Sequence, residues 1–213
     1  MGESFIVEGR RPSLIAILRG LPPEDAIAVG QALYDAGFRV IEVPLNRPGA
    51  LVCIERLAAT FGASAIVGAG TVLSPAEVDA VAAAGGRLIV SPDCNPDVIR
   101  ATRGRGLWSL PGVATPSEAF TAMRAGAHAV KAFPAEALPP AVIKSWRSVI
   151  PRELGIYPVG SITPQKILEY RSANAGIDGF GLGGALYQQG MALEELTRRA
   201  KSFVSAWTQT VGQ

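Results

Sequence analysis

The strongest constraint on the fold is a cycle of strand and helix signals that repeats eight times along the 213 residues. Each cycle holds a short apolar run, rich in β-branched or aromatic side chains, followed by a segment of helical length. Short runs of this composition are typical of buried strands rather than helices. The eight runs span 14–18, 39–43, 65–69, 87–91, 107–110, 129–133, 155–159 and 177–183.

Capping signals mark where the helical segments begin and end. "SPAE" at 74–77 and "TPSE" at 115–118 each place a hydroxyl N-cap, a first-turn proline and a capping-box glutamate. "NP" at 95–96 and "TP" at 163–164 repeat the cap and proline pair. Glycines close the helical segments, for example in "DAGF" at 35–38. The predicted starts and ends of the helices therefore agree with the predicted positions of the strands.

Strands that alternate with helices favour a parallel sheet covered by helices, and eight units close into a (β/α)8 barrel. A doubly wound open sheet is the main competitor, but its spacing is seldom so even, and no GxGxxG follows the first strand. Barrels of this kind often form one domain of more than about 200 residues. We therefore predict an α/β chain with a single (β/α)8 TIM-barrel domain over 1–213, in which 1–12 form a short N-terminal extension.

Composition excludes several functional classes. The net charge is +2 and the arginines are scattered, so nucleic-acid binding has little support. No apolar run reaches the roughly 18 residues that span a bilayer, and the N-terminus lacks a signal-peptide pattern. Cys53, Cys94 and the single histidine, His128, provide neither a disulfide framework nor a metal-ligand cluster. We expect a cytoplasmic protein that needs no metal or other cofactor and binds neither nucleic acid nor membrane.

One lysine interrupts an apolar strand pattern. Lys131 lies inside "AVKAF", although lysine is almost never fully buried unless another group compensates it. In a strand with a two-residue period, Lys131 and Phe133 share one face. By the same alternation, Glu42 in "VIEVP" lies opposite Ile41 and Val43, which suit the layer that faces the helices. We therefore expect Lys131 and Glu42 to project into the barrel.

A buried acid and a buried base near one mouth of a barrel could form a structural ion pair. We favour a catalytic pair, because an apolar cavity disfavours the charged form of each group. That environment suits an amine nucleophile and a carboxyl proton shuttle. Active sites of such barrels also lie at the C-terminal ends of the strands, where both residues are expected.

Further candidates follow the other strand ends. Arg19 could cap a loop, but its planar fork also suits a substrate carboxylate. Two glycine-rich clusters could be ordinary turns, but together they favour phosphate binding through backbone N–H groups. These clusters comprise Gly160, Ser161, Gly181, Gly183 and Gly184. Asn46 and Thr71 follow the second and third strands, and we expect Pro92 and Phe133 to shape the pocket walls.

Three residues are weaker candidates. His128 is expected to face the helix layer in a structural role, and Cys53 to pack within a helix. Cys94 follows the fourth strand at the expected active end, but nothing near it in the sequence resembles a base.

Seven motifs resemble the class I aldolases of 2-keto-3-deoxy-6-phospho sugar acids. They occur in the same order, from about Leu14 to Gly190: "LIAILRG", "EVPLN", "GAGTVL", "LIVSP", "GVATPSEAF", "VKAFP" and "GLGGALY". The resemblance implies a lyase in which Lys131 forms a Schiff base and Glu42 moves protons. It also implies that Thr71 helps to hold the pyruvate portion, that the last two glycine loops hold phosphate, and that the protein is a homotrimer.

The motif around Glu42 separates two branches of that family. The phosphogluconate type typically reads Glu-x-Thr-x-Arg, whereas this chain reads "EVPLN" and lacks that arginine, although Arg47 follows Asn46. "EVPLN" is similar to the 6-phosphogalactonate type, in which Arg19 would take the carboxylate. Ser161 departs from the family by standing where a second glycine is common.

The resemblance therefore implies cleavage of 2-dehydro-3-deoxy-6-phosphogalactonate to pyruvate and D-glyceraldehyde 3-phosphate. The alternatives are cleavage of the phosphogluconate epimer or of 4-hydroxy-2-oxoglutarate. A non-catalytic sugar-phosphate-binding barrel is the alternative of another class.

Overall fold

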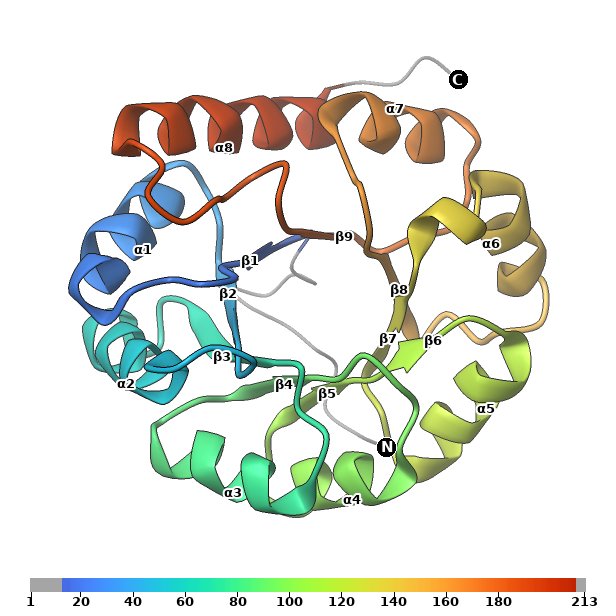
Figure 1. The fold of residues 1–213 in the computed structure, drawn as a ribbon. Helices are drawn as coiled ribbons and strands as arrows, with labels where there is room; N and C mark the ends of the chain where they lie inside the picture. The colour runs from blue at the N-terminus through green and yellow to red at the C-terminus, as the bar shows by residue number, and fades with distance from the viewer. Residues whose placement is uncertain (1–12, 210–213) are drawn as a thin grey trace.

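The structure is a computed structural model that describes residues 13–209. Within these residues, a ring of parallel strands occupies the centre, and eight α-helices surround it (Figure 1). The fold is the predicted α/β TIM barrel. The predicted N-terminal extension, 1–12, lies outside the described residues, and the single-domain assignment to 1–213 remains a prediction.

Each of the eight predicted apolar runs contains a strand, and a further strand, β6, lies just after the fifth run. All the pairings between these strands are parallel, in the orders β5-β4-β3-β2-β1-β9 and β6-β7-β8. The strands are β1 Leu14–Ile17, β2 Val40–Pro44, β3 Ile66–Gly70, β4 Leu88–Val90, β5 Trp108–Leu110, β6 Gly112–Val113, β7 Ala129–Ala132, β8 Gly155–Pro158 and β9 Phe180–Leu182.

Pro111 separates β5 from β6. Proline has no backbone N–H and cannot donate to a strand ladder. Its carbonyl still accepts a hydrogen bond from the Lys131 N–H at 2.9 Å. The chain before Pro111 pairs with β4 and the chain after it pairs with β7, so the ring continues through this residue.

The helices begin where the capping signals predict. Ser74 and Glu77 form a complete capping box, and Asn95, Thr115 and Thr163 each cap the helix that follows. The helices are α1 Ala26–Asp35, α2 Ala50–Phe61, α3 Pro75–Ala83, α4 Pro96–Gly104, α5 Pro116–Ala125, α6 Pro140–Arg147, α7 Pro164–Ser172 and α8 Leu193–Thr208, with short 3-10 helices η1 Pro23–Asp25 and η2 Ala135–Ala137.

Alternation along the strands separates two apolar cores. Ile41 and Val43 belong to the large core between the strands and the helices, whereas Val40 belongs to a smaller core inside the barrel. Glu42 therefore points inward, as its position in the alternation predicts. On β7, Val130 lies in the outer core and Ala129 in the inner one, which turns Lys131 inward as well.

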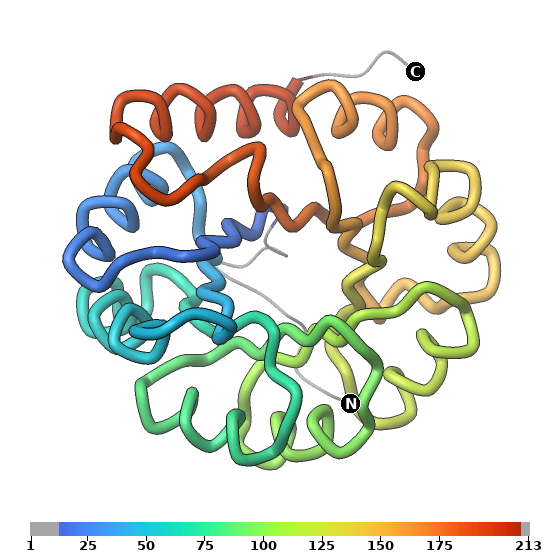
Figure 2. The backbone as a smooth tube through the Cα atoms, in the orientation of Figure 1, coloured from blue at the N-terminus to red at the C-terminus, as the bar shows by residue number. Residues whose placement is uncertain are grey.

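The first and last strands are neighbours, so the chain returns to its starting point around the ring (Figure 2). The junction between β8 and β9 is the least extensive in the ring. It contains one isolated bridge, Val159–Gly181, and Asp178, whose N–H donates to the Ile156 carbonyl at 3.0 Å and whose carboxylate accepts from the Ile156 N–H at 2.9 Å. By contrast, β2 and β3 pair over five residues. Within residues 13–209, no helix is long and apolar enough to cross a membrane.

Candidate active site

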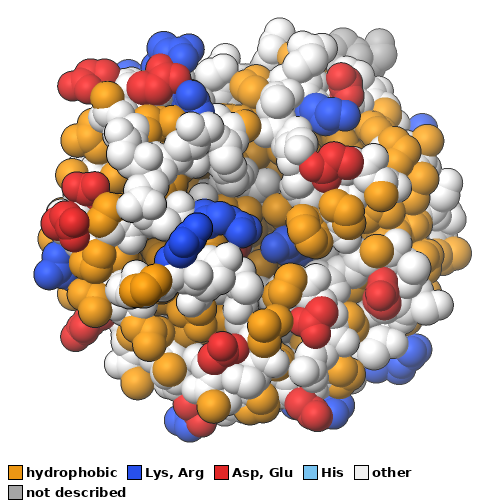
Figure 3. Space-filling view, viewed as in Figure 1, with side chains coloured by type: hydrophobic (Ala, Val, Ile, Leu, Met, Phe, Trp, Pro, Cys, Tyr) orange, Lys and Arg blue, Asp and Glu red, His pale blue; other side chains and the backbone are white. Residues whose placement is uncertain are grey.

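A cavity of about 880 Å³ opens at the C-terminal ends of the strands. Its mouth is the hollow at the centre of the face shown in Figure 3, where Lys and Arg side chains border the opening. Of the described residues that line it, two are cationic, Arg19 and Lys131. The lining includes all but one of the predicted site residues: Arg19, Glu42, Asn46, Thr71, Pro92, Lys131, Phe133, Gly160, Ser161, Gly183 and Gly184.

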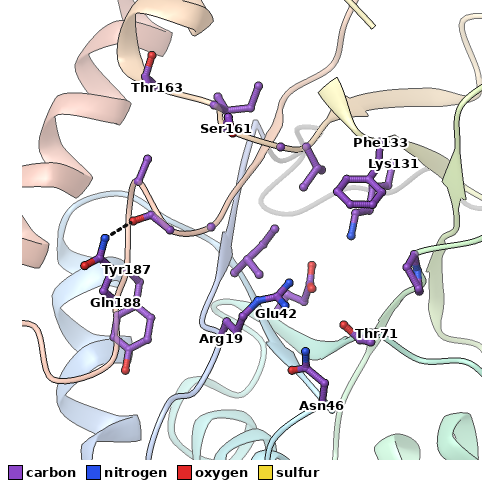
Figure 4. Close-up of a pocket in the computed structure, with 18 of the residues that line it drawn as sticks. Arg19, Glu42, Asn46, Thr71, Lys131, Phe133, Ser161, Thr163, Tyr187 and Gln188 are labelled. Atoms are coloured by element: carbon purple, nitrogen blue, oxygen red, sulfur yellow. Dashed lines mark hydrogen bonds between the residues drawn. The ribbon is translucent and has the colours of Figure 1, made fainter. Parts of the chain in front are cut away.

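Lys131 and Glu42 point toward one another across this cavity (Figure 4). Both are buried, with 9% and 2% of their surfaces exposed. Among residues 13–209, however, no ion pair within 4.0 Å joins them. The Lys131 amino group instead lies 4.7 Å from the centroid of the Phe133 ring. Space therefore remains between the two charged groups, which is unlike a closed structural ion pair.

Burial raises the pKa of the Glu42 carboxyl, and the positive charges of Lys131 and Arg19 only partly offset that rise. A raised pKa brings a carboxyl group closer to the pH at which it can both accept and return a proton. The environment of Glu42 is thus suited to proton transfer.

Gly70 makes room for the Glu42 carboxyl. A Cβ atom at position 70 would lie 1.6 Å from Glu42 Oε1. The sequence alone shows a glycine in "GAGT", but it does not show which side chain approaches that glycine from the neighbouring strand. Gly70 is therefore a residue of the site that sequence reasoning missed.

Two residues of the lining have a backbone conformation that is rare outside glycine. Thr71 has φ 56° and Ser161 has φ 46°. A positive φ is unusual for any residue with a side chain and is a strong outlier for a β-branched one. Such a conformation costs about 1–3 kcal/mol and persists where the surrounding structure imposes it. Both ends of the cavity therefore contain a strained residue.

The end of the cavity near α7 is lined by backbone rather than by charged side chains. Within the part of the chain that the structure describes, the N–H groups of Ser161, Ile162, Gly184 and Ala185 donate no hydrogen bond to a protein acceptor. Thr163 caps α7, and the N-terminus of a helix carries a partial positive charge. This end has the features of an anion-binding site.

Gly181 is the predicted site residue that the cavity does not include. It lies within β9, where a Cβ atom would meet Val159 Cγ2 at 2.7 Å and Ile17 Cδ1 at 3.2 Å. Its lack of a side chain therefore permits close strand packing at the closure of the barrel. Gly181 was predicted as a phosphate contact, and the structure places it within a strand rather than among the residues that line the cavity.

The structure also places the weaker candidates. Arg47 lines a neighbouring depression of about 300 Å³, and Cys94 donates from Sγ to the Glu118 carbonyl at 3.4 Å. Neither is among the residues that line the main cavity. His128 accepts a hydrogen bond from the Ser109 N–H through Nδ1 and contacts Arg103 of α4, so it lies against the helix layer. Cys53 donates to the Leu21 carbonyl at 3.3 Å.

Several lining residues were not predicted from the sequence. Tyr187, Gln188 and Gln189 enter the cavity from the irregular segment before α8, and Thr163 from the start of α7. Burial raises the pKa of Tyr187 to about 12, so its phenol is neutral at physiological pH. A loop without periodicity gives no sequence signal for the direction of its side chains.

The fold and the cavity define a (β/α)8 barrel with a polar site at its C-terminal mouth. The model of the KDPG and KHG aldolase family matches residues 7–202. The chain belongs to this family and is a class I aldolase, a lyase.

Three relatives are similar over nearly their whole length. The 2-dehydro-3-deoxy-6-phosphogalactonate aldolase of Escherichia coli (strain K12) is 43% identical, over 93% of this chain and 96% of the relative. The probable enzyme of the same name from Rhizobium meliloti (strain 1021) is 44% identical, over 93% of each chain. A solved native KDPGal structure is 42% identical, covers 95% of this chain and 97% of that one, and has a TM-score of 0.90.

Proposed function

We propose that the chain cleaves 2-dehydro-3-deoxy-6-phosphogalactonate to pyruvate and D-glyceraldehyde 3-phosphate. The observation that carries the proposal is the placement of the Lys131 amino group inside the barrel, opposite the Glu42 carboxyl and without a direct ion pair. The phosphogalactonate aldolases at 43% and 44% identity supply the substrate class.

The first half of the reaction forms a covalent bond to Lys131. The neutral amine attacks the C2 keto carbon of the substrate and gives a carbinolamine. A proton taken up from solvent lets the carbinolamine hydroxyl leave as water, which gives a protonated Schiff base, an electron sink. The Lys131 side chain is 9% exposed and lines the cavity, so its amino group lies where the C2 keto carbon of a bound substrate would be.

The second half breaks the C3–C4 bond. The Glu42 carboxylate, through a water molecule, takes the C4 hydroxyl proton, and the electron pair of the C3–C4 bond moves toward the iminium. This step releases glyceraldehyde 3-phosphate and leaves an enamine on Lys131. The enamine takes the proton back from Glu42 at C3, and hydrolysis of the resulting Schiff base releases pyruvate and the free lysine.

The two ends of the cavity fit the two ends of this substrate. Arg19 and Thr71, on the Glu42 side, would hold the carboxylate, with Asn46 nearby (Figure 4). The backbone N–H groups of Ser161, Ile162, Gly184 and Ala185 would hold the phosphate at the opposite end. Pro92 and Phe133 would form walls between these ends.

Borohydride trapping with pyruvate tests the Schiff base. Reduction followed by peptide mass spectrometry is expected to place a pyruvate adduct on Lys131 of the wild type and to find none in Lys131→Ala. A folded wild-type protein that forms no adduct would remove this mechanism.

The choice of epimer depends on the residues around Glu42. Exposed Asn46 lines the cavity, whereas Arg47, the nearest arginine in the sequence, does not. This arrangement supports the galactonate type, in which Arg19 takes the carboxylate. Cleavage of the two C4 epimers, followed by coupled detection of pyruvate, tests the choice. A higher kcat/KM with the phosphogluconate epimer would favour the alternative substrate.

Two further predictions concern the state of the protein. We propose that it is a cytoplasmic homotrimer, as the family resemblance implies. Mass photometry of the purified chain is expected to give three times the 22.2 kDa mass of one chain. A single species at 22.2 kDa would contradict the trimer.

A further inference from the structure

A carboxylate from another segment contacts the loop after β8, which contains Gly160 and Ser161 and lines the proposed phosphate end of the cavity. The Ser161 hydroxyl donates to Glu136 Oε1 at 2.5 Å, and Glu136 belongs to η2, which follows the strand of Lys131. Glu136 does not line the main cavity. A negative group next to a proposed phosphate site is unexpected, because it would repel the ligand unless it has another role.

The carboxylate is fitted to the loop through both of its oxygen atoms. Oε1 accepts from Ser161, and a Cβ atom at position 160 would lie 2.4 Å from Oε2. Because Gly160 has no Cβ atom, the Glu136 carboxylate can lie close to the backbone of the loop at this position, where φ is 124°. The loop and Glu136 are complementary in shape as well as in hydrogen bonding.

The short helix η2 is itself fixed against the same part of the barrel. The Ala135 N–H donates to the Val159 carbonyl at 2.9 Å, one residue before the loop. The Tyr170 hydroxyl, from α7, donates to the Leu138 carbonyl at 2.6 Å. The segment that carries Glu136 is thus held by Val159, directly after β8, on one side and by Tyr170 of α7 on the other.

Ser161 needs such support because of its backbone. With φ 46° it occupies a conformation that glycine adopts without strain and that other residues adopt only when the surrounding structure imposes it. A hydrogen bond to a charged carboxylate is stronger than one between neutral groups and can offset that strain. The Ser161 hydrogen bond also lowers the pKa of the exposed Glu136 carboxyl, so the carboxylate is charged at neutral pH.

We propose that Glu136 is a positioning residue for phosphate recognition: it holds Ser161 in the left-handed conformation that presents the Ser161 and Ile162 N–H groups to the ligand. The inference rests on the proposed function, which places the phosphate at this loop. Solvent around the exposed carboxylate screens its repulsion of the phosphate, so the geometric effect dominates.

Kinetics of phosphorylated and unphosphorylated substrate test this role. E136A is expected to raise KM for the phosphorylated sugar acid, and Ki for inorganic phosphate, about 10-fold, with kcat within about twofold. The same sugar acid without its phosphate is expected to show no change in KM. E136Q keeps an acceptor for the Ser161 hydroxyl and is expected to retain most of the wild-type affinity. E169A removes a nearby exposed carboxylate of α7 and serves as the matched control.

A double-mutant cycle identifies the residue through which Glu136 acts. In an S161G background the strain is absent, so E136A is expected to change KM by less than about twofold. The proposal fails if E136A leaves KM unchanged or lowers it, if its effect persists with S161G, or if kcat falls equally with both substrates. Failure of the proposed function looks different, since the wild type would then not cleave the phosphorylated substrate. Calorimetric titration of the variants with inorganic phosphate would still test Glu136.

Discussion

The barrel interior has two layers built from the same strands but with different chemistry. The upper layer lies at the C-terminal ends of the strands, and the lower layer lies nearer their N-terminal ends. The lower layer is apolar and closely packed, with Val40 of β2 and Ala129 of β7 among its members. Two residues further along these strands, the upper layer contains Glu42 and Lys131. Because the side chains of a strand alternate with a period of two, residues i and i+2 both point into the barrel. They lie at different depths and therefore have different neighbours.

This difference shows how one ring of strands serves both stability and chemistry. The lower side chains exclude water and fix the strand register, whereas Glu42 and Lys131 of the upper layer are buried and, among residues 13–209, form no ion pair with each other. Buried groups of that kind lower stability and are retained where they have a function. Substitutions that make one layer resemble the other should therefore change activity and stability in opposite directions.

Making the upper layer apolar at Lys131 should have the largest effect on activity. Lys131→Met keeps a long side chain but removes the amine, and it is expected to lower kcat/KM by at least about 10⁴-fold. The thermal midpoint should stay equal or rise by a few degrees, because a buried polar amino group is replaced by an apolar group. Activity assays and calorimetry measure the two effects. A marked loss of stability would show that Lys131 belongs to the structural framework.

Glu42→Gln is expected to lower kcat by roughly 10²–10⁴-fold. The deprotonated carboxyl accepts the C4 hydroxyl proton, so wild-type activity should rise with pH through the pKa of Glu42. Burial raises that pKa, which places the acidic limb above the ordinary value of 4.5. The pH–rate profile of the variant should lack this limb. Its persistence would assign the limb to another group.

Gly70→Ala tests the fit between two neighbouring strands of the upper layer. The new Cβ atom would overlap Glu42 Oε1, and a displacement of a catalytic group by about 1 Å can cost about 10²-fold in rate. Gly68→Ala is the matched comparison, because its Cβ atom would lie 2.0 Å from the Leu88 carbonyl oxygen, which is backbone. We expect the first variant to lose mainly kcat and the second mainly thermal stability. Equal losses in both variants would contradict this distinction.

A change confined to the lower layer should have the smallest effect on activity. Ile66 of β3 is 3% exposed and belongs to the inner core. Ile66→Ala is expected to lower the free energy of unfolding by about 2–5 kcal/mol. Its kcat should remain within about twofold of the wild type at temperatures where it is folded. Denaturant unfolding and steady-state kinetics test both statements, and a large fall in kcat would show that the layers are coupled.

Much of the fold could be predicted from the sequence because its signals are local. Apolar runs, N-cap residues and first-turn prolines occur once per unit, and each of the runs contains a strand. The inward direction of Glu42 and Lys131 followed from alternation with Ile41, Val43 and Val130, which depends on neighbouring residues alone. Strand β6, which follows Pro111 and lies outside the fifth predicted run, was not predicted.

The remaining parts of the site depend on contacts between distant segments. The need for glycine at position 70 comes from Glu42 on another strand, and the packing role of Gly181 comes from Val159 and Ile17. Likewise, the contact between Glu136 and Ser161 joins the segments after β7 and β8, which lie side by side because these two strands pair. No periodicity within either segment reports such a contact.

The sparse junction between β8 and β9 lies directly below the two loops proposed to hold phosphate, since one loop follows each of these strands. A ligand that binds both loops would connect β8 and β9 and so stabilise the least extensive junction of the ring. Ligand occupancy and closure of the barrel are then thermodynamically linked. Bound sugar phosphate should protect the amides beside Val159 and Gly181 from hydrogen exchange more than those between β2 and β3.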